Sequence, residues 1–266
     1  MLIDAAGYEH EPSKGSIRII SLVPSLTELL FAMDLGDDVV GRTAFCIEPA
    51  GTIESVPVVG GTKTSEMDKM VALKPTHVLV NIDETPKELA EQIAATGADV
   101  VVTHPNTPAD NIALFQLVGN LFHRQTQADA LVRALEAELA QTATWPERQV
   151  LYLIWKRPWM TVSQDTYIAN MLGMFGMKTM CHDPDRRYPE VTIDSALLAE
   201  ADLILFSSEP FPFAQKHMDA FAHEHKIEHK ITTDPRLLAI DGRMVSWYGN
   251  RAIDGLKYLR TFASQL

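Results

Sequence analysis

The stretch that decides the fold reads RIISLVPSLTELLFAM and runs from Arg18 to Met33. Its first six residues are mostly apolar and β-branched and are followed by Pro24, a pattern typical of a short buried strand. The next segment, Ser25-Leu26-Thr27-Glu28, has the spacing of a capping box, in which the Ser and Glu side chains bond free amides at a helix start. We therefore expect a helix from this box to Met33.

Strands and helices continue to alternate along the rest of the chain. Further short apolar runs predict strands over residues 38–43, 77–81, 99–103, 149–155, 201–206 and 227–231. The segments between them predict helices that start near residue 65 and cover 86–96, 107–122, 126–144, 166–175, 193–199, 212–223 and 249–263. Because parallel strands need a crossover, usually a helix, this alternation predicts an α/β fold with mostly parallel sheets flanked by helices.

An internal repeat and one long helix predict that the fold has two lobes. Residues 68–80 align with residues 194–206, and each segment has an acid, a short helix, a turn and a buried strand in the same order. At about 1.5 Å per residue, the helix predicted over 126–144 spans roughly 30 Å, which is long enough to reach from one lobe to another. We expect an N-terminal lobe over 17–125, a connecting helix over 126–144 and a C-terminal lobe over 145–266.

The composition is that of a folded protein with an acidic surface. The chain has 266 residues, of which 46% are hydrophobic and 22% charged, and its net charge is −12. Because a nucleic-acid site needs a basic surface against the phosphates, no nucleic-acid partner is expected. Residues 1–144 hold 9 Lys and Arg against 20 Asp and Glu, whereas residues 145–266 hold 14 against 15. This asymmetry predicts two lobes with different electrostatic faces, unless the first half simply carries more solvated acids.

The motifs of common enzyme sites are missing from the sequence. The segment Gly60-Gly61-Thr62-Lys63-Thr64 fails as a phosphate-binding loop because Thr62, and not glycine, precedes the lysine. No Gly-x-Gly-x-x-Gly follows a predicted strand, and no Gly-x-Ser-x-Gly is present. We therefore expect no catalytic residues and a protein that is not an enzyme.

The histidines and cysteines have poor spacing for a metal site. Four histidines gather near a predicted helix end, namely His217, His223, His225 and His229. Their only four-residue step lies beyond that end, which favours a solvated surface. Cys46 could meet the segment Cys181-His182-Asp183 in a soft metal site, but neither cysteine has another close by in sequence. No metal ligand and no intrinsic cofactor are predicted.

Aromatic residues in predicted loops indicate a ligand site. They stand within two positions of Pro, Gly or Arg, and they are Trp155, Trp159, Tyr188, Trp247 and Tyr248. Loops at strand ends are where open α/β sheets bind ligands, and Trp and Tyr there suit a large, flat, partly apolar molecule. Arg187 is one of several basic residues nearby that could take anionic groups of this ligand. The alternative is that these aromatics pack in the interface between the lobes.

The opening motif, together with later segments, resembles a known family. Residues 18–30 resemble the start of the helical-backbone metal-chelate receptors, the substrate-binding proteins of cobalamin and ferric-siderophore uptake. Further landmarks follow in the family's order: Gly60-Gly61 with residues 68–75 and the strand after them, Trp159-Met160-Thr161-Val162, Tyr188-Pro189-Glu190-Val191 and Ser246-Trp247-Tyr248-Gly249. The resemblance runs from residue 18 to the C-terminus and is closest to the cobalamin-binding branch.

The resemblance implies a class III periplasmic-binding-protein fold, with two α/β lobes joined by one long helix and the ligand in the cleft between them. It implies a substrate-binding protein that captures a metal chelate, cobalamin or a related corrinoid, for ABC-type uptake. The alternatives are a ferric-siderophore or haem receptor, and a leaderless cytoplasmic protein or enzyme of the same fold that handles a corrinoid or a metal. Arg187 and the five loop aromatics are then the expected ligand contacts.

The resemblance also implies a partner in the membrane. Receptors of this family carry one acid per lobe that meets arginines of an ABC-transporter permease, and Asp68 and Asp194 are at the matching positions. Glu66 and Glu190, close by in each repeat, could supply a longer reach. The alternative is that both Asp residues only cap their helices.

The start of the chain gives two expectations for its location. Residues 1–10 have no basic segment and no long apolar run, so they do not resemble a leader. We expect a periplasmic or membrane-associated protein if a leader was removed, and a cytoplasmic one if the chain starts at Met1 as given.

Overall fold

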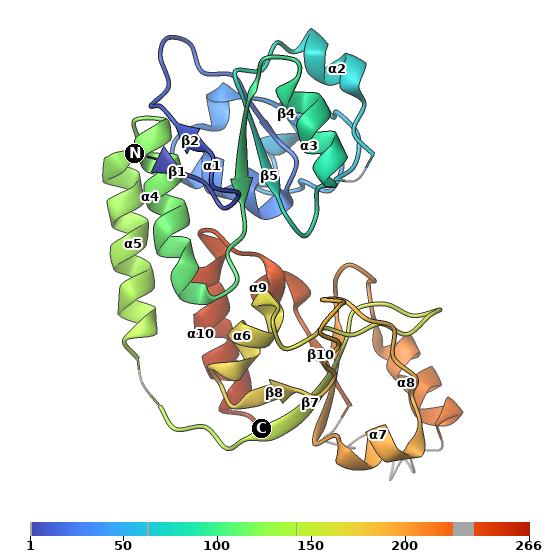
Figure 1. The fold of residues 1–266 in the computed structure, drawn as a ribbon. Helices are drawn as coiled ribbons and strands as arrows, with labels where there is room; N and C mark the ends of the chain where they lie inside the picture. The colour runs from blue at the N-terminus through green and yellow to red at the C-terminus, as the bar shows by residue number, and fades with distance from the viewer. Residues whose placement is uncertain (1, 63, 142, 226–236) are drawn as a thin grey trace. The chain divides into compact units, whose positions relative to one another are not determined.

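The computed structural model describes residues 2–62, 64–141, 143–225 and 237–266, which form two compact units (Figure 1). Unit 1 comprises Met1–Pro105, Ala109–Ala137 and Tyr248–Ile253. Unit 2 comprises Asn106–Pro108, Glu138–Trp247 and Asp254–Leu266. Each unit contains one four-stranded parallel sheet with helices on both faces, so the predicted α/β class with two parallel sheets is confirmed.

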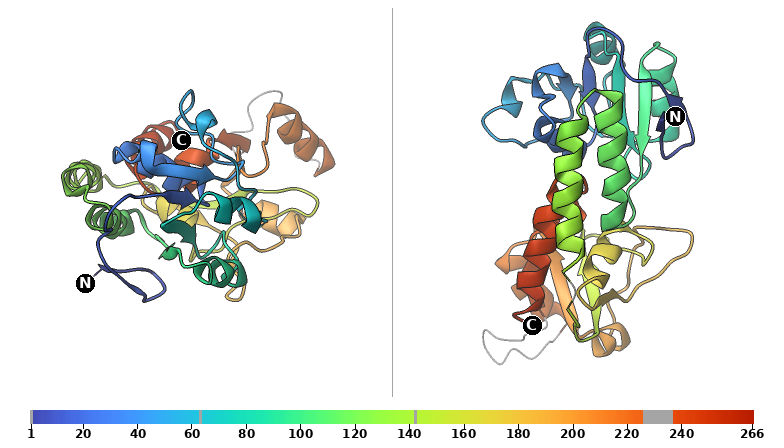
Figure 2. Two further views of the ribbon diagram at one scale, coloured as in Figure 1. Left: turned by 90° about the horizontal axis from the view of Figure 1, so that it is seen from above. Right: turned by 90° about the vertical axis from the view of Figure 1, so that its left-hand side faces the viewer.

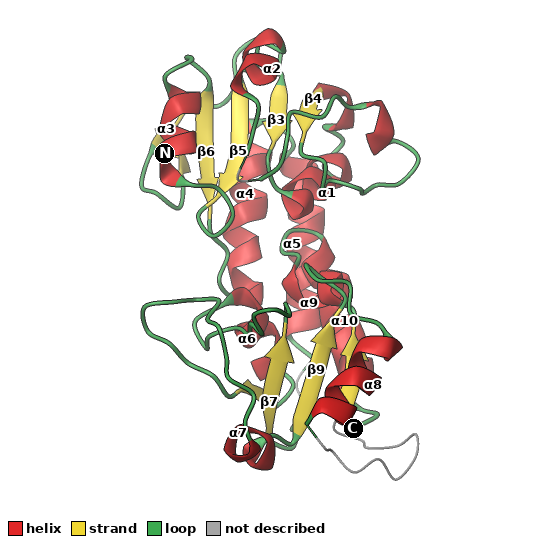
Figure 3. Cartoon of the chain, turned by 90° about the vertical axis from the view of Figure 1, so that its right-hand side faces the viewer, coloured by secondary structure: helices red, strands yellow, loops and turns green. Residues whose placement is uncertain are grey.

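The sheet of unit 1 has the strand order β4-β3-β5-β6 (Figure 3). Its strands are β3 (Ile19–Ser21), β4 (Val39–Arg42), β5 (His77–Asn81) and β6 (Asp99–Thr103). Every residue of the two central strands, β3 and β5, is buried, as expected for a parallel sheet covered on both faces. A two-stranded antiparallel hairpin of β1 (Leu2–Ile3) and β2 (Glu9–His10) precedes this sheet.

Helices cover unit 1 as right-handed crossovers require. The helices are α1 (Pro24–Ala32), α2 (Met67–Ala72), α3 (Lys87–Ala94), α4 (Asn111–Leu121) and α5 (Gln125–Leu139). From β3 the chain crosses to β4 on one side, and from β4 it crosses back over β3 to β5 and on to β6. Because each crossover is right-handed, this change of direction places α1 on the opposite face of the sheet from α2 and α3. Met70 of α2 and Ile93 of α3 pack with Ile20 and Val78 in one core.

The sheet of unit 2 repeats this topology. Its strands are β7 (Arg148–Leu153), β8 (Met177–Thr179), β9 (Leu203–Ser207) and β10 (Leu237–Ile240), in the order β10-β9-β7-β8. Its helices are α6 (Tyr167–Gly173), α7 (Ser195–Glu200), α8 (Gln215–Glu224), α9 (Gly242–Ser246) and most of α10 (Arg251–Ala263). Both sheets therefore have their strands in the order second, first, third, fourth. The predicted repeat is confirmed, because α2 with β5 and α7 with β9 take the same place in their sheets.

The predicted capping box is wrong. Helix α1 begins at Pro24, and no side chain caps its N-terminus. Proline at the first helical position has no amide that would need a cap. Glu28 instead receives two hydrogen bonds from the guanidinium of Arg251, at 2.9 and 2.5 Å.

The long helix is shorter than predicted. Helix α5 ends at Leu139, whereas the sequence predicted a helix as far as residue 144. Helices α4 and α5 lie side by side (Figure 2), and a Cβ at Gly119 would come within 2.5 Å of the Ala128 Cβ. The strands β8 and β10 and helix α9 were not predicted, and the predicted strand over 227–231 lies outside the described residues.

Candidate ligand-binding site

The strand order places a candidate ligand site at the carboxyl ends of each sheet. In open α/β sheets ligands bind where the chain leaves neighbouring strands in opposite directions, which here is beside the first strand of each sheet. In unit 1 this edge carries the segments that follow β3, β4 and β5, and in unit 2 those that follow β7 and β9. These loops are where the ligand contacts are expected.

Large apolar side chains are exposed on these loops. Phe45 and Ile47 follow β4, Ile82 follows β5 and Trp155 follows β7, and between 40 and 62% of each residue is exposed. Exposed apolar surface at the mouth of a sheet is typical of a ligand site, because a ligand that covers it gains about 25 cal/mol per Å². Sequence reasoning named only Trp155. The other three could have been found as large apolar residues in the segments that follow strands, with Ile82 directly after a strand end.

The loop that carries Phe45 is held in place by hydrogen bonds from the side chains of Arg42 and Thr27. The Arg42 guanidinium donates to the carbonyl oxygens of Cys46 at 3.0 Å and Ile53 at 3.0 Å. The Thr27 hydroxyl donates to the Cys46 sulfur at 3.0 Å, and burial raises the pKa of that thiol. Because Cys46, the next residue, is buried and hydrogen-bonded in the core, the backbone on this side of Phe45 is fixed while the Phe45 side chain stays exposed.

The loops after β7 and β9 in unit 2 form an aromatic cluster. The Trp155 ring meets Phe211 edge-on at 5.5 Å, and the Trp159 ring stacks on Phe213 at 6.0 Å. The Lys156 ammonium lies 5.2 Å above the Phe211 ring. Phe211 and Phe213 were missed by sequence reasoning, although both flank a proline just after a buried strand.

The structure brings two of the family-like segments together. The amide of Val191 donates to the Trp159 carbonyl at 2.9 Å, and the amide of Thr161 donates to the Pro189 carbonyl at 3.0 Å. Tyr188, which is half-buried, is therefore next to a short two-stranded pairing with the segment that carries Trp159. These two predicted contacts belong to one substructure of unit 2.

The guanidinium of Arg187 already has protein partners. It donates to the Asp165 carbonyl and to the Asn106 side-chain oxygen, both at 2.7 Å. The half-buried side chain thereby joins three segments of unit 2. Its first role is structural, so it is a weaker candidate for binding ligand anions than its sequence position indicated.

Trp247 and Tyr248 are neighbours in sequence but belong to different units. Trp247 ends α9 in unit 2, is buried, and donates from its indole to a Glu209 carboxylate oxygen at 2.9 Å. Tyr248 is buried in unit 1, and burial raises its pKa well above 10 while hydrogen bonds with Ser25 and Thr103 oppose that rise. Both residues were expected to contact the ligand, but the indole and the phenol are packed inside the protein and expose little ring surface.

The four acids predicted for a membrane partner are all exposed. Asp68 is in the first turn of α2, and Asp194 accepts the Leu197 amide at 2.8 Å as the N-cap of α7. Glu66 pairs with Lys69 at 2.8 Å. Glu190 is in the loop paired with Met160. Asp194 thus has the capping role that was the alternative, while its side chain is still exposed.

The described residues give no support for a metal site. No group of three or more His, Cys, Asp or Glu in the described ranges could hold a metal ion. Cys46 is buried in unit 1 and Cys181 half-buried in unit 2, while His217 accepts the Ala214 amide at 3.0 Å. His229 lies outside the described residues. In the same ranges, no helix has the length and apolarity needed to cross a bilayer.

Two parallel α/β units with exposed apolar side chains on their carboxyl-end loops are typical of two-lobed ligand-binding proteins. The sequence pattern of the periplasmic binding protein family matches residues 19–229, and the chain belongs to this family. It is therefore a binding protein and not an enzyme, as predicted.

Comparison with curated proteins gives relatives of low identity. A vitamin B12-binding protein of Photorhabdus laumondii is 23% identical over 211 residues, which cover 78% of this chain and 76% of the relative. An uncharacterized ABC transporter substrate-binding lipoprotein of Bacillus subtilis, YvrC, is 24% identical over 267 residues, which cover 96% and 82%.

Solved structures show the same fold. The periplasmic vitamin B12 binding protein BtuF of Vibrio cholerae matches with a TM-score of 0.77 and 20% identity, over 93% of this chain and 96% of that one. The periplasmic heme-binding protein RhuT from Roseiflexus sp. RS-1 matches with a TM-score of 0.76 and 21% identity, over 94% and 99%. At these identities the likeness shows the architecture, and the ligand needs a separate argument.

Proposed function

We propose that this chain is the substrate-binding protein of an ABC-type uptake system and that it captures cobalamin or a related corrinoid. The observation that carries the proposal is the set of exposed apolar side chains on the carboxyl-end loops, with Trp155 and Phe45 the largest. A corrin ring is a broad, partly apolar disc, and such a ligand covers flat aromatic surface well. The vitamin B12-binding relatives support the same ligand class.

Haem is the second candidate, and a ferric siderophore the third. Haem is favoured by the likeness to solved haem-binding proteins and by Tyr188, a half-buried phenol beside the Trp159 segment. Tyrosine is one of the side chains that hold haem iron. The position of the ligand between two lobes, divided at 17–125, 126–144 and 145–266, stays a prediction.

A titration distinguishes these ligands. Cyanocobalamin, haemin and a ferric hydroxamate would each be added to the purified protein and followed by intrinsic Trp fluorescence and calorimetry. We expect one cobalamin per chain, and Phe45→Ala and Trp155→Ala should each weaken binding by about 1–3 kcal/mol. Val71→Ala removes an exposed apolar side chain from α2 and is the matched control. Binding of haemin but not cobalamin, or unchanged affinity in both variants, would contradict the proposal.

We further propose that an ABC-transporter permease is the partner and that the protein acts in the periplasm or on the membrane surface. The support is the relatives' description as periplasmic or lipoprotein binding proteins, together with the exposed Asp68 and Asp194. The relatives lend no support to a cytoplasmic location, and we do not propose one. Glu66 and Glu190 are the nearby acids that could extend the contact.

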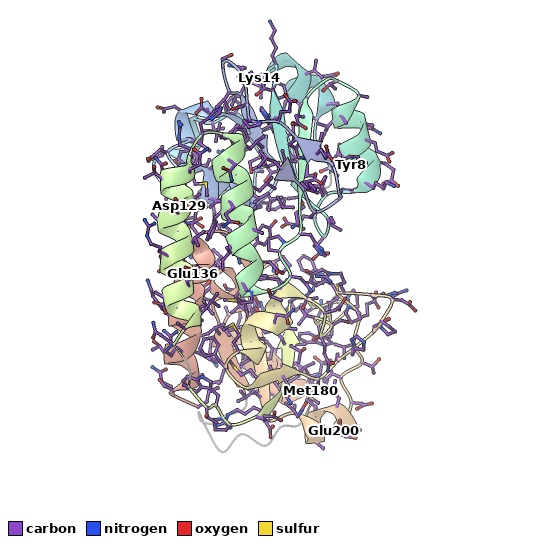
Figure 4. The ribbon with its side chains drawn as sticks, turned by 60° about the vertical axis from the view of Figure 1, so that its left-hand side comes forward. Tyr8, Lys14, Asp129, Glu136, Met180 and Glu200 are labelled. Carbon is purple, nitrogen blue, oxygen red and sulfur yellow. The ribbon has the colours of Figure 1, made fainter. Side chains whose placement is uncertain are left out.

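Charge reversal tests the partner. Asp68→Lys with Asp194→Lys should abolish uptake and leave chelate affinity unchanged, because exposed charges act mainly on encounter and orientation. Asp129→Lys with Glu136→Lys is the control, since both residues are exposed on α5 (Figure 4). Equal uptake by the two double variants would refute the docking role.

A further inference from the structure

The hairpin of residues 2–10 is attached to the edge of the unit 1 sheet. It lies outside the family match, which begins at residue 19. The Ala5 amide donates to the Val102 carbonyl, and the Val102 amide donates to an Asp4 carboxylate oxygen, both at 2.9 Å. Val102 belongs to β6, the outermost strand on this side. The hairpin therefore satisfies backbone groups that an edge strand would otherwise leave open.

One carboxylate organises the hairpin. The Asp4 side chain is wholly buried, and one of its oxygens accepts the amides of Ala6 and Tyr8 at 2.9 Å each. These bonds close the turn that presents the exposed Tyr8 side chain (Figure 4). The other oxygen takes the Val102 amide and lies 3.2 Å from His10 Nε2.

His10 stands between two carboxylates. Its side chain is 2% exposed, and its Nδ1 lies 2.9 Å from an oxygen of Asp99, at the start of β6. Both ring nitrogens thus face an acceptor. The Nδ1–H can donate to Asp99, whereas the Nε2 atom forms no hydrogen bond, so its contact with Asp4 is an attraction between charges that exists only while the ring is protonated.

We propose that Asp4, His10 and Asp99 form a pH-dependent clasp, which fastens the hairpin to β6 while His10 is protonated and loosens it when His10 loses its proton. Loosening would expose the edge of β6. It would also remove one wall of a partly open cavity of about 290 Å³, which residues 3–5 of the hairpin line together with Leu114 and Leu117 of α4.

The charges around His10 give the direction of the effect. Burial lowers its pKa, but its interactions with Asp99 and Asp4 together outweigh burial, so the pKa lies above the usual value. His77 on β5 is a further titratable neighbour, and burial lowers its pKa, so it loses its proton at a lower pH than His10 does. A raised pKa in the folded protein means that the clasp is fully formed below the ordinary histidine pKa. It is lost as pH rises through the pKa of His10.

Amide exchange with NMR detection tests the clasp in the full chain. The protection factors of Ala5 and Val102, corrected for the intrinsic pH dependence, should fall by at least about threefold between roughly pH 5.5 and pH 8.5. The His10 ring titration should follow the same midpoint. In His10→Gln both amides should be weakly protected at every pH, and in Asp99→Asn the His10 midpoint should move to lower pH.

His182→Gln is the control, because His182 is exposed in unit 2. It should leave the pH profile of both amides unchanged. The same profile in the native protein and in His10→Gln would overturn the proposal. Loss of protection on acidification instead of on alkalisation would also overturn it.

Discussion

The ion pair between Glu28 and Arg251 should be a main support of unit 1. The guanidinium meets both carboxylate oxygens, and the side chains are only 15 and 14% exposed. Glu28 is on α1, whereas Arg251 is the first residue of α10. Near its C-terminus the chain re-enters unit 1 with the short segment Tyr248–Ile253. The ion pair therefore holds this segment against helix α1.

The geometry sets the size of the effect. Truncating one partner removes two charge-assisted hydrogen bonds and leaves the other charge largely buried, so Arg251→Gln should cost about 2–4 kcal/mol. Glu66 and Lys69 are the control pair, at 2.8 Å but 54 and 55% exposed. Solvent screens such a pair, and Lys69→Gln should cost at most about 0.5 kcal/mol.

The assay must report on unit 1, because the two units need not unfold together. All four tryptophans are in unit 2, so their fluorescence cannot serve. The buried Cys46 thiol can, since it becomes open to a thiol reagent when unit 1 unfolds in urea. With Cys181 replaced by Ala, labelling would give the free energy of unfolding for Glu28→Gln, Arg251→Gln and the double variant. A coupling energy below about 0.5 kcal/mol in this cycle would refute the reasoning.

Three further results are expected. Gly119→Ala should destabilise unit 1 by about 1–3 kcal/mol in the same assay, because its new methyl group would collide with Ala128 on α5; an unchanged midpoint would mean that the helices separate freely. Tyr152→Phe should cost about 1 kcal/mol by Trp fluorescence in urea, since the buried hydroxyl donates to Ser207 at 3.0 Å; no cost would mean that this bond adds nothing to folding. In the native protein, a thiol reagent should modify the half-buried Cys181 before Cys46, and the reverse order by mass spectrometry would show that unit 1 opens readily.

The sequence predicted strands best where a continuous apolar run marks them. The strands over 77–81 and 99–103 have the predicted bounds, because each contains such a run, although only the first is buried throughout and the second is a partly buried edge strand. Strands β3 and β8 are both three residues long, but β3 lies within the mostly apolar run of residues 18–23, whereas the segment of β8 has the charged Lys178 at its centre. Local sequence predicts a short strand when apolar residues continue on both sides of it.

The capping box failed because its residues have distant partners. Ser25 and Glu28 fit a local cap by spacing, yet Glu28 binds a residue 223 positions later in the chain. Nothing within one turn of helix distinguishes a carboxylate that caps from one that forms an ion pair. Only the topology, which returns Arg251 to α1, decides between them.

The sequence predicted which types of residue line the candidate site, but it did not predict to which unit each of them belongs. Loop aromatics after β7 were found because two Trp residues stand close to Pro158 in a predicted loop, and Trp155 is exposed as a contact should be. Trp247 and Tyr248 look equivalent in sequence, but Trp247 is the C-cap of α9 in unit 2, whereas Tyr248 begins a segment of unit 1. Phe45 was missed because its loop has no regular pattern, and its exposure follows from the Arg42 bonds beneath it.

Three arginines near the expected contacts already have hydrogen-bond partners within the protein. Arg187 donates hydrogen bonds to Asp165 and Asn106, and Arg251 donates to Glu28. Arg42 donates to backbone carbonyls of the loop that follows it. Each guanidinium would have to give up short hydrogen bonds before it could bind a ligand anion. A corrinoid held by aromatic surfaces should therefore bind with an affinity that changes by less than about twofold between low and high salt. A strongly anionic chelate that depended on these arginines would instead lose affinity steeply with salt, so the salt dependence of binding discriminates between the two kinds of ligand.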